Sequence, residues 1–583
     1  MLSLNQKKAV TTTQGKVLIL AGAGSGKTTV IIARICELLD KGVDPSQILG
    51  LTFTNKAAEE MRARLKHPKR AEVQLSTFHS FCHSILRKEI HHLGYTREFS
   101  IYDDRDMERV RKTASYSEDK ELTEDEIAVK VDEALRAYNA LNFDRMISLT
   151  VTLFKEHPEV LKRYQYQYVM IDEYQDTNQA QFELAEAISA EHQNLCVVGD
   201  DDQAIYGWRG AEVRHILRFK ADHTIKLEEN YRSHPLILHA ANGVIANNVD
   251  RHKKTLISTR PLGNPIEIFH APTEKDEVEA VINRIIRLQG RYALGDMAIL
   301  YRSNALSRPF ETELIRRKIP YQVFGGLELY SRTEVKDLIA YLRFIHNERD
   351  QEALLRIINY PSRGISNATL DYLTQLNRKQ KRPLIEILRS PHPSLNPRAQ
   401  EAIETFVHLM DMMKTSFKRK PLDEAMKELI DVIGYKQALE QEFKTPSVQE
   451  AKWQNVQATI DWLKEVTDLE EFLSSTTLNQ GHSKKKERSS KLLNLMTLHS
   501  AKGLEFPACF IVGLEDDILP HSKCFGLEEE RRLFYVGITR AKDELILSMS
   551  QARTKWGKPA PSNPSRFLYE IPKEVLRVSH WNQ

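Results

Sequence analysis

Short apolar runs alternate with amphipathic segments along most of the chain, and this alternation predicts a mixed α/β fold. Residues 17–20 form an apolar run that indicates a buried strand. A segment rich in glycine and alanine follows it. From Gly26 onward, apolar residues recur at the spacing of a helix, namely at Val30, Ile31, Ile35, Leu38 and Leu39. A strand, a glycine loop and a helix in that order are typical of a phosphate-binding loop.

Apolar runs of this kind fall into two groups, which predict two parallel sheets flanked by helices. The first group comprises residues 17–20, 48–53, 73–75, 168–171 and 195–198, and the second comprises 266–269, 297–301, 321–324, 493–498 and 508–512. Parallel strands present their carboxyl ends at one edge of a sheet, where ligands bind. Only the first group carries a glycine loop, so we interpret the second unit as its partner and not as another complete nucleotide site.

Two long stretches interrupt these strands. From about residue 84 to residue 163 the sequence is charged and helical, and we expect no strand there. From about residue 347 to residue 491 it is again mostly helical, with several prolines. We interpret both stretches as helical insertions.

Composition narrows the function classes. The net charge of the 583 residues is only +3, so any affinity for nucleic acid must come from local basic surface. The five cysteines form no CxxC pair, which argues against zinc, an iron–sulfur cluster or disulfides and favours a reducing compartment. No apolar run approaches the roughly 18 residues of a membrane span. We therefore expect a soluble cytoplasmic protein without a membrane partner.

The glycine loop carries the chemistry of triphosphate binding. Backbone N–H groups and a helix N-terminus attract an anion, Lys27 adds a point charge, and the Thr28 hydroxyl can ligate Mg²⁺. The usual pattern begins with glycine, and Ala21 stands in that place. The predicted phosphate-contacting residues are Ala21, Gly22, Ala23, Gly24, Ser25, Gly26, Lys27, Thr28 and Thr29.

Polar side chains at later strand ends complete the predicted site. Asp172 follows a buried strand directly, as does the carboxylate that holds Mg²⁺ and its water in other phosphate-loop enzymes. Glu173 is placed to act as a general base on the attacking water, and Gln203 can sense the γ-phosphate. Arg232 and Arg540 can reach a phosphate across a domain cleft.

Other residues suggest a surface for nucleic acid. Tyr206 and Trp208, with Arg209 between glycines, form a predicted base-stacking platform. Asn55 and His79 stand in polar clusters that mix hydroxyl, amide, basic and aromatic groups, as a surface that follows a strand would. Taken singly, each of these two clusters is better explained as an ordinary helix cap.

The ordered set of motifs resembles the UvrD/PcrA/Rep-like superfamily 1 DNA helicases over essentially the whole chain. The matching stretches are Gln6 with Ala9 and Val10, AGAGSGKT, LTFTNKAAEEM, STFHSFC, IDEYQDTNQ, VVGDDDQAIYGWRGA, LEENYRS, AILYRSNALSR, YQVFGG, LMTLHSAKGLEFP and EEERRLFYVGITRA.

This resemblance implies two RecA-like motor domains with ATP and Mg²⁺ between them, each interrupted by a helical subdomain. We predict the first motor domain at residues 1–83 and 164–230 with its insertion at 84–163, and the second at 231–346 and 492–583 with its insertion at 347–491. It also implies ATP-driven 3′→5′ movement on single-stranded DNA, unwinding at single/double-strand junctions, and a role in DNA repair or replication. Self-association on DNA is left open.

Site roles carried over by the resemblance are as follows. Gln6 and Tyr231 are expected at adenine, Lys27 and Thr28 at the phosphates and Mg²⁺, Asp172 at the metal, Glu173 as catalytic base, Gln203 as γ-phosphate sensor, Arg232 and Arg540 as arginine fingers, and Glu505 at the nucleotide. The DNA-facing set is expected to include Phe53, Tyr206, Trp208, Arg209 and His499.

Three departures from the family pattern stand out. Thr29 occupies the place of an arginine that stacks on adenine, which predicts weaker ATP binding or looser base selectivity. Ser366 stands where a glycine of a duplex-contacting turn is common, and serine tolerates a left-handed backbone less well. Both insertions are also short.

Three other functions are compatible with parts of the sequence. The first is a translocase that strips proteins from single strands with little unwinding. The second is a non-catalytic DNA-binding protein with a decayed ATPase, against which the complete set of predicted catalytic residues argues. The third is a phosphate-loop kinase or transport ATPase, which leaves the aromatic platform unexplained.

Overall fold

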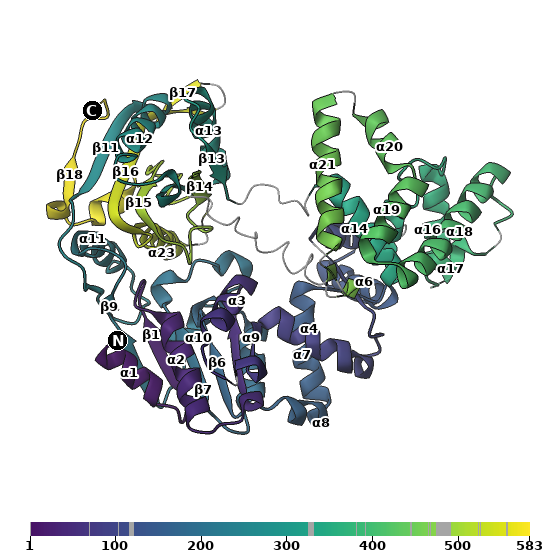
Figure 1. Cartoon of the computed structure of the whole chain (residues 1–583), viewed down its shortest axis with the longest axis horizontal. Coiled ribbons are helices and arrows are strands. Elements are labelled where there is room, and N and C mark those ends of the chain that lie inside the picture. Colours follow the sequence, from purple (N-terminus) through teal and green to yellow (C-terminus); the bar gives the residue numbers. More distant parts are fainter. Residues whose placement is uncertain are drawn as a thin grey trace. The chain divides into compact units, whose positions relative to one another are not determined.

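The computed structural model describes residues 2–68, 70–102, 104–115, 122–324, 332–380, 382–390, 392–443, 446–464, 466, 468–470, 472–473, 491–522, 524, 526–555 and 558–582. Its internal contacts divide the chain into two compact units. The first comprises the described residues of Met1–Phe78, Leu161–Gly326 and Lys484–Gln583, and the second those of His79–Val160 and Leu327–Ser483. Figure 1 shows the elements of both.

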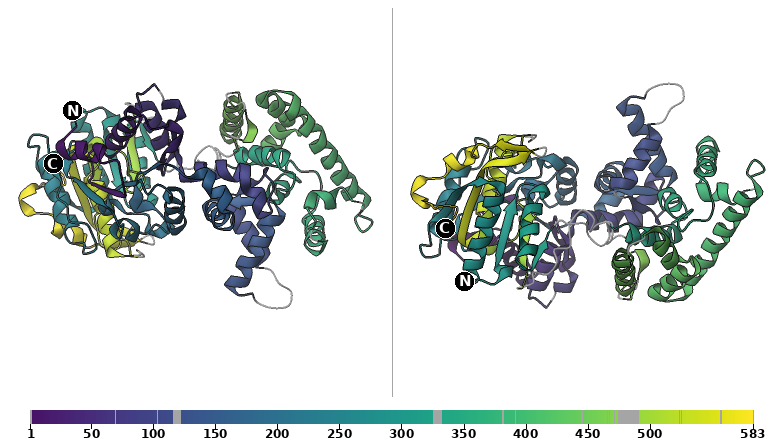
Figure 2. Two further views of the ribbon diagram at one scale, coloured as in Figure 1. Left: turned by 90° about the horizontal axis from the view of Figure 1, so that it is seen from below. Right: turned by 90° about the horizontal axis from the view of Figure 1, so that it is seen from above.

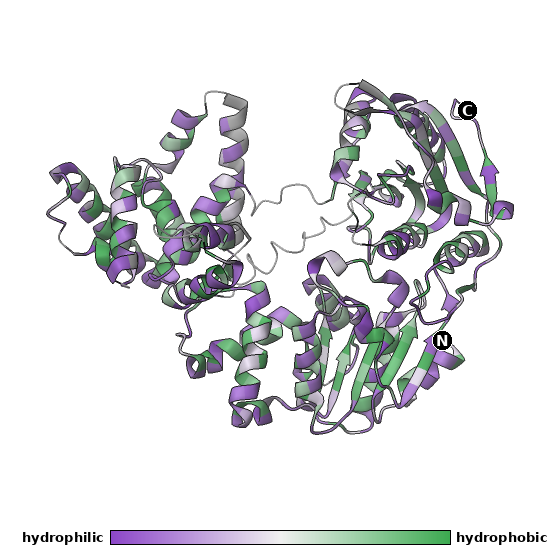
Figure 3. Cartoon of the chain, turned by 180° about the vertical axis from the view of Figure 1, so that it is seen from behind, coloured by the Kyte–Doolittle hydropathy of each residue, from purple (hydrophilic) through white to green (hydrophobic). Residues whose placement is uncertain are grey.

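The first unit contains two largely parallel sheets. The first sheet has the strand order β3-β2-β6-β7-β1-β8, and all its neighbouring strands are parallel. Its strands are β1 (Val17–Ala21), β2 (Ile48–Thr52), β3 (Gln74–Thr77), β6 (Tyr168–Ile171), β7 (Leu195–Gly199) and β8 (His223–Leu227). Four of them, β1, β2, β6 and β7, are buried throughout, in keeping with their apolar sequences (Figure 3). The segments after β1, β6 and β7 therefore meet at one edge of the sheet.

Helices cover this sheet as the apolar spacing predicts. Val30, Ile31, Ile35, Leu38 and Leu39 of α2 are all buried in a core shared with β1 and β7. The helices of this part are α1 (Leu4–Thr11), α2 (Lys27–Asp40), α3 (Asn55–Arg64), α9 (Gln179–Ser189) and α10 (Arg214–Leu217).

The second sheet has the order β13-β14-β12-β15-β16-β11-β18, with β17 antiparallel to β16. Its strands are β11 (Ile266–Thr273), β12 (Met297–Tyr301), β13 (Tyr321–Val323), β14 (Leu493–Thr497), β15 (Phe506–Ile511), β16 (Ala541–Lys555), β17 (Lys558–Pro561) and β18 (Leu576–Val578). Its helices are α11 (Pro235–Ile245), α12 (Glu274–Leu288), α13 (Ser307–Arg316) and α23 (Leu527–Ile538). Strands far apart in sequence pair directly, as β11 and β16 do (Figure 2). A short pair, β9 (Glu229–Asn230) and β10 (Ile257–Ser258), lies between the sheets in sequence.

The second unit is mostly helical. Its helices are α4 (Phe78–Glu89), α5 (Asp104–Ala114), α6 (Glu124–Ala137), α7 (Phe143–Glu156), α8 (Pro158–Leu161), α14 (Thr333–His346), α15 (Gln351–Ile357), α16 (Asn367–Gln380), α17 (Leu384–Leu388), α18 (Pro397–Arg419), α19 (Leu422–Val432), α20 (Tyr435–Glu442) and α21 (Pro446–Leu463). The expectation of no strand between residues 84 and 163 is wrong. β4 (Ser100–Tyr102) and β5 (Ala140–Asn142) pair in parallel there, too short to show a sequence pattern.

The predicted fold class is confirmed, and each of the ten predicted strands is present. β8, β16 and the short strands β4, β5, β9, β10, β17 and β18 were not predicted from the sequence. The residue limits of the six predicted segments stay predictions. Within the described ranges, no helix combines the length and apolarity that crossing a bilayer requires.

Candidate active site

The phosphate loop follows β1 at the carboxyl edge of the first sheet. Gly24 and Gly26 have φ of +66° and +84°, a backbone that other residues rarely adopt. A Cβ atom at Gly24 would lie 2.6 Å from Asn230 Nδ2, and one at Gly26 would lie 2.9 Å from Gln6 Nε2. The Lys27 ammonium donates to the Ala21 carbonyl at 3.1 Å, and half-buried Thr28 lies in the first turn of α2. Only glycine therefore fits these two positions, and the loop leads directly into the N-terminus of α2, whose backbone N–H groups can attract an anion.

Gln6 and Tyr231 border this loop. Gln6 Nε2 donates to the Ser25 carbonyl at 2.9 Å, and its Oε1 accepts from the Ser3 backbone at 3.0 Å. The Tyr231 backbone N–H donates to the Gly24 carbonyl at 3.0 Å, while 44% of this residue is exposed. The structure thus brings both predicted base-contacting residues to the phosphate loop.

Thr29 has a partner that the sequence analysis missed. Arg64 Nη2, at the end of α3, donates to the Thr29 hydroxyl at 2.8 Å, and its Nη1 pairs with Glu60 at 3.0 Å. The missing arginine at position 29 predicted a base site without a cation. Arg64 instead brings a guanidinium to this position from another helix. No local pattern relates residues 29 and 64, so only the fold reveals the pair.

Two adjacent carboxylates follow β6. Burial and the charge of Glu173 raise the pKa of Asp172 to about 7. Burial would also raise the pKa of Glu173, but Lys27 and Lys502 outweigh it and lower that pKa. Glu173 has φ of +52°, and its Oε2 accepts from Gln175 Nε2 at 2.5 Å. Glu173 is thus the charged member of the pair and is fixed in place, as a general base must be.

Two cations next to strands of the second sheet, Lys502 and Arg540, contact Gln203 beside the first sheet. Lys502, which follows β14, contacts the Asp176 carboxylate and donates to the Gln203 carbonyl at 2.8 Å. The Lys502 ammonium also lies 3.7 Å from Glu173 Oε2. Arg540, at the start of β16, is 1% exposed and donates to Gln203 Oε1 at 3.3 Å. Because Gln203 follows β7, the two sheets share one site.

Arg232 is held differently from Arg540. Its Nε donates to Glu505 Oε2 at 2.7 Å, and its Nη1 donates to the Thr539 carbonyl at 3.0 Å. Glu505 also pairs with Lys542 at 2.7 Å, and these two cations overcome burial and lower the pKa of Glu505 to about 2. Arg232 therefore already has a carboxylate partner beside the site.

Two family models together match most of the chain. The model of the UvrD/REP helicase N-terminal domain matches residues 2–131 and 112–224, and that of the UvrD-like helicase C-terminal domain matches residues 225–552. The chain belongs to the UvrD-like helicase family. The ATP-dependent DNA helicase PcrA of Staphylococcus epidermidis is 38% identical over 646 residues, which cover 100% of this chain and 88% of the relative. PcrA of Staphylococcus aureus is 38% identical over 636 residues, which cover 99% and 87%.

Among the predicted DNA-facing residues of this helicase, Arg209 and His499 lie beside Trp208. Trp208 is 46% exposed. The guanidinium carbon of Arg209 lies 4.5 Å from the centroid of the Trp208 ring. The centroid of the His499 ring lies 6.2 Å from that of Trp208, with the two rings edge to face. Tyr206 packs partly against the core of the second sheet. The ring centroids of Phe53 and Phe78 lie 5.5 Å apart. Asn55 is the first residue of α3, and Thr54 is the N-cap of that helix. His79 belongs to the second unit, where its ring contacts Phe143.

Ser366 does not adopt the left-handed backbone that serine tolerates poorly. The left-handed residue of that turn is Gly364, with φ of +77°. The Ser366 hydroxyl accepts from the Thr369 backbone at 3.2 Å at the start of α16. Serine is a favoured residue at a helix N-terminus. The turn therefore keeps its glycine where the backbone requires one.

Proposed function

We propose that this protein is an ATP-dependent DNA helicase that moves 3′→5′ along single-stranded DNA and unwinds duplex. The observation that carries the proposal is Arg540. Its partners in the described part of the chain are neutral oxygens of Val536, Leu504, Gln203 and Thr539. Burial lowers the pKa of its guanidinium to about 9. The charge of Glu173 offsets this burial only in part. A buried cation without an ion-pair partner is costly, and a phosphate on the glycine loop would supply further negative charge.

The residues present fit ATP with Mg²⁺. A Cβ atom at Gly24 or Gly26 would collide with Asn230 or Gln6, so these glycines let the loop hold its tight left-handed turns beside those residues. Asp172 and the Thr28 hydroxyl would hold Mg²⁺, which when bound neutralises phosphate charge. Burial and the neighbouring Glu173 raise the pKa of Asp172, and a bound Mg²⁺ would favour its charged carboxylate.

Each side chain then has a defined task. Gln6 and Tyr231 hold adenine, and Lys27 holds the phosphates. Glu173 accepts a proton from the attacking water. Gln203 contacts the γ-phosphate, while Arg232 and Arg540 offset its developing charge.

Movement on DNA follows from the two-sheet arrangement. ATP attracts Arg232 and Arg540, and with them the second sheet, toward the phosphate loop. Trp208 and His499 come from different sheets and contact each other, so closure shifts the surface on which bases stack. Hydrolysis removes the γ-phosphate whose charge attracts Arg232 and Arg540, so the two sheets can separate again.

The polarity test uses ATP hydrolysis and unwinding together. Single-stranded DNA is expected to stimulate hydrolysis, and duplexes with a 3′ tail are expected to be unwound in preference to those with a 5′ tail. Hydrolysis that does not respond to DNA would contradict the helicase assignment. Stimulation without unwinding would instead indicate a translocase.

Several finer features belong to this proposal. We propose that the substrate is single-stranded DNA with its duplex junction, that copies of the helicase can associate on DNA, and that repair or replication in the cytoplasm is the setting. The names of the relatives support a DNA substrate. Free cysteines in the described chain are compatible with a reducing compartment.

Removal of the Arg64 guanidinium is expected to weaken ATP binding. A cation beside an aromatic or heteroaromatic ring contributes about 0.5–2 kcal/mol, so Arg64→Ala should raise the KM for ATP roughly 2- to 30-fold. Steady-state hydrolysis of ATP and GTP measures this effect. Thr29→Arg should restore affinity in the Arg64→Ala background, because it returns a cation to the same place. Glu60→Ala, which removes only the partner of Arg64, is the control, and failure of the rescue would contradict the assignment.

Trp208→Ala is expected to weaken coupling to DNA more than basal hydrolysis. Stacking contributes about 1–3 kcal/mol per base, so half-maximal stimulation should require roughly 5- to 150-fold more single-stranded DNA. Titration of DNA into the ATPase assay measures this change. Tyr569→Ala, at another exposed aromatic residue, serves as control. Equal loss of basal and stimulated hydrolysis would assign Trp208 a purely structural role.

A further inference from the structure

A lysine is buried among three aspartates beside the candidate active site. Lys254 lies between α11 and β10 in the sequence, and only 1% of its side chain is exposed. Its Nζ lies 2.9 Å from Asp200 Oδ1, 2.7 Å from Asp201 Oδ1 and 2.7 Å from Asp202 Oδ2. These carboxylates follow β7 and are at most 1% exposed. Lys254 therefore supplies positive charge to a loop that could not otherwise be buried.

Only one other cation is paired with these carboxylates in the described chain. Arg251 binds Asp202 through Nε at 2.8 Å and Nη2 at 2.7 Å. Asp200 and Asp201 have Lys254 as their ion-pair partner. Removal of one partner from a buried ion pair is strongly destabilising because the remaining charge stays buried. The position of Asp200 thus depends on Lys254.

Asp200 connects this lysine to the predicted γ-phosphate sensor. Its Oδ1 faces Lys254, and its Oδ2 accepts from Gln203 Nε2 at 2.5 Å. The other end of the Gln203 amide, Oε1, accepts from Arg540 at 3.3 Å. A continuous chain of contacts therefore runs from Lys254 through Asp200 and Gln203 to Arg540. Lys254 falls within the C-terminal family domain, whereas Asp200 and Gln203 fall within the N-terminal one.

We propose that Lys254 is a positioning residue for ATP hydrolysis, which acts by holding Asp200 so that the Gln203 amide keeps its orientation toward Arg540. The inference rests on the proposed function, which places Gln203 at the γ-phosphate. Lys254 touches no nucleotide in this scheme. Its loss frees the Asp200 carboxylate, and the Gln203 amide then loses its fixed acceptor.

A matched pair of substitutions separates positioning from stability. Asp200→Asn and Asp201→Asn each remove one charge next to Lys254, but only Asp200 contacts Gln203. Both variants are expected to melt at lower temperature than the wild type. DNA-stimulated kcat should fall about tenfold or more in Asp200→Asn and stay within about twofold of the wild type in Asp201→Asn. Equal kcat in the two variants would overturn the proposal.

A double-mutant cycle tests the path through Gln203. Lys254→Met should lower kcat in the wild-type background and cause no further loss in the Gln203→Ala background, while the change in melting temperature should be the same in both. Independent, multiplicative losses in kcat would overturn the inference. No effect of Gln203→Ala alone would instead remove the proposed role of Gln203. If Lys254→Met does not fold, the asparagine pair still decides the question.

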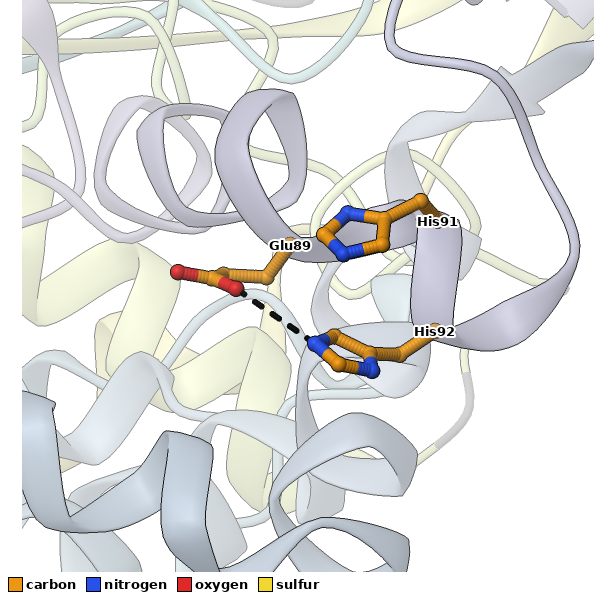
Figure 4. A group of neighbouring side chains, drawn as sticks. All are labelled: Glu89, His91 and His92. Carbon is orange, nitrogen blue, oxygen red and sulfur yellow. Dashed lines mark ion pairs between the residues drawn. The ribbon is translucent and has the colours of Figure 1, made fainter.

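A separate observation concerns histidines of the second unit. Glu89, His91 and His92 lie at the end of α4 and in the turn after it, with ligand atoms within 4.8 Å of one another (Figure 4). His92 Nε2 lies 3.7 Å from Glu89 Oε2, and its ring lies 4.7 Å from that of His157. His157 Nδ1 lies 3.1 Å from Glu159 Oε1. His92 thus belongs to two adjoining groups of imidazole and carboxylate ligands.

These ligand types suit a transition-metal ion. Nitrogen and oxygen ligands bind Zn²⁺ at about 2.0–2.2 Å, which separates tetrahedral ligand atoms by roughly 3.3 Å. The His157 Nδ1–Glu159 Oε1 distance in the second group is 3.1 Å, close to that value, and the His92 Nε2–Glu89 Oε2 distance in the first group is 3.7 Å. The expectation that zinc is absent rested on cysteines alone. We propose that His92, His157 and Glu159 form a Zn²⁺-class site that joins the turn after α4 to the segment after α7.

Metal titration tests this second proposal. Calorimetry of the nucleotide-free protein with Zn²⁺ alone should show one site that His92→Ala weakens at least tenfold. His239→Ala is the matched control, because His239 faces a single carboxylate, Glu574, at 3.8 Å. Undiminished Zn²⁺ binding by His92→Ala, or no Zn²⁺ binding by the wild type, would overturn the proposal.

Discussion

Alanine in place of Lys27 is expected to abolish DNA-stimulated ATP hydrolysis, with a loss in kcat of roughly 10²- to 10³-fold or more. Lys27 is the cation of the phosphate loop, and its ammonium lies at the Ala21 carbonyl. Lys27 is half-buried at the carboxyl edge of the first sheet, where solvent screens its charge less than at an open surface, so solvent does not fully replace it. Steady-state phosphate release with saturating single-stranded DNA measures the change.

Lys41→Ala provides the matched control for this experiment. Lys41 directly follows the same helix, α2, and pairs with Glu37 at 3.1 Å on the surface. Its loss should leave kcat unchanged, because an exposed pair of this kind contributes little. Hydrolysis by Lys27→Ala at the wild-type rate would show that the glycine loop is not the catalytic phosphate site.

Glutamine in place of Glu173 is expected to stop turnover while ATP still binds. The amide keeps the size of the carboxylate but cannot accept a proton, and general-base catalysis contributes about 10²- to 10⁴-fold. Retained affinity is expected because Lys27 and the loop backbone are unaltered. Binding of a fluorescent ATP analogue and single-turnover hydrolysis separate the two effects.

A loss of affinity in Glu173→Gln equal to the loss of kcat would assign this residue to binding and not to proton transfer. The control must remove a carboxylate that has no proposed role at the nucleotide, which excludes the neighbouring Asp172. Glu186→Gln meets this condition, since Glu186 lies on α9 and pairs with Lys16 at 2.7 Å away from the loop. Its kcat and its affinity for ATP should both match the wild type.

Local signals in the sequence predicted the fold class and the loop. Each predicted strand is a short apolar run, and α2 shows its buried face directly in its spacing. Glycine, lysine and threonine in the loop have fixed spacing because one backbone segment surrounds the phosphates. Patterns within a few residues therefore sufficed for these features.

Contacts between distant segments could not be predicted in this way. Arg64 reaches Thr29 from another helix, Lys254 reaches Asp200 from beyond the first sheet, and Lys502 reaches Asp176 across the two sheets. A lysine or arginine in the sequence gives no sign of its partner, because most such residues lie in solvent. The backbone at Ser366 could not be predicted for a related reason, since residue type alone did not show that Gly364 is the left-handed position of the turn.

The left-handed backbone of Glu173 lowers the stability of the protein at a residue that the proposed reaction requires. A non-glycine residue at φ of +52° strains the chain by about 1–3 kcal/mol, and glycine would relieve that strain. Laboratory evolution for heat resistance alone would therefore favour glycine at position 173 and discard the carboxylate. A thermostable population obtained without a selection for unwinding would be expected to contain well-folded chains that no longer turn over ATP.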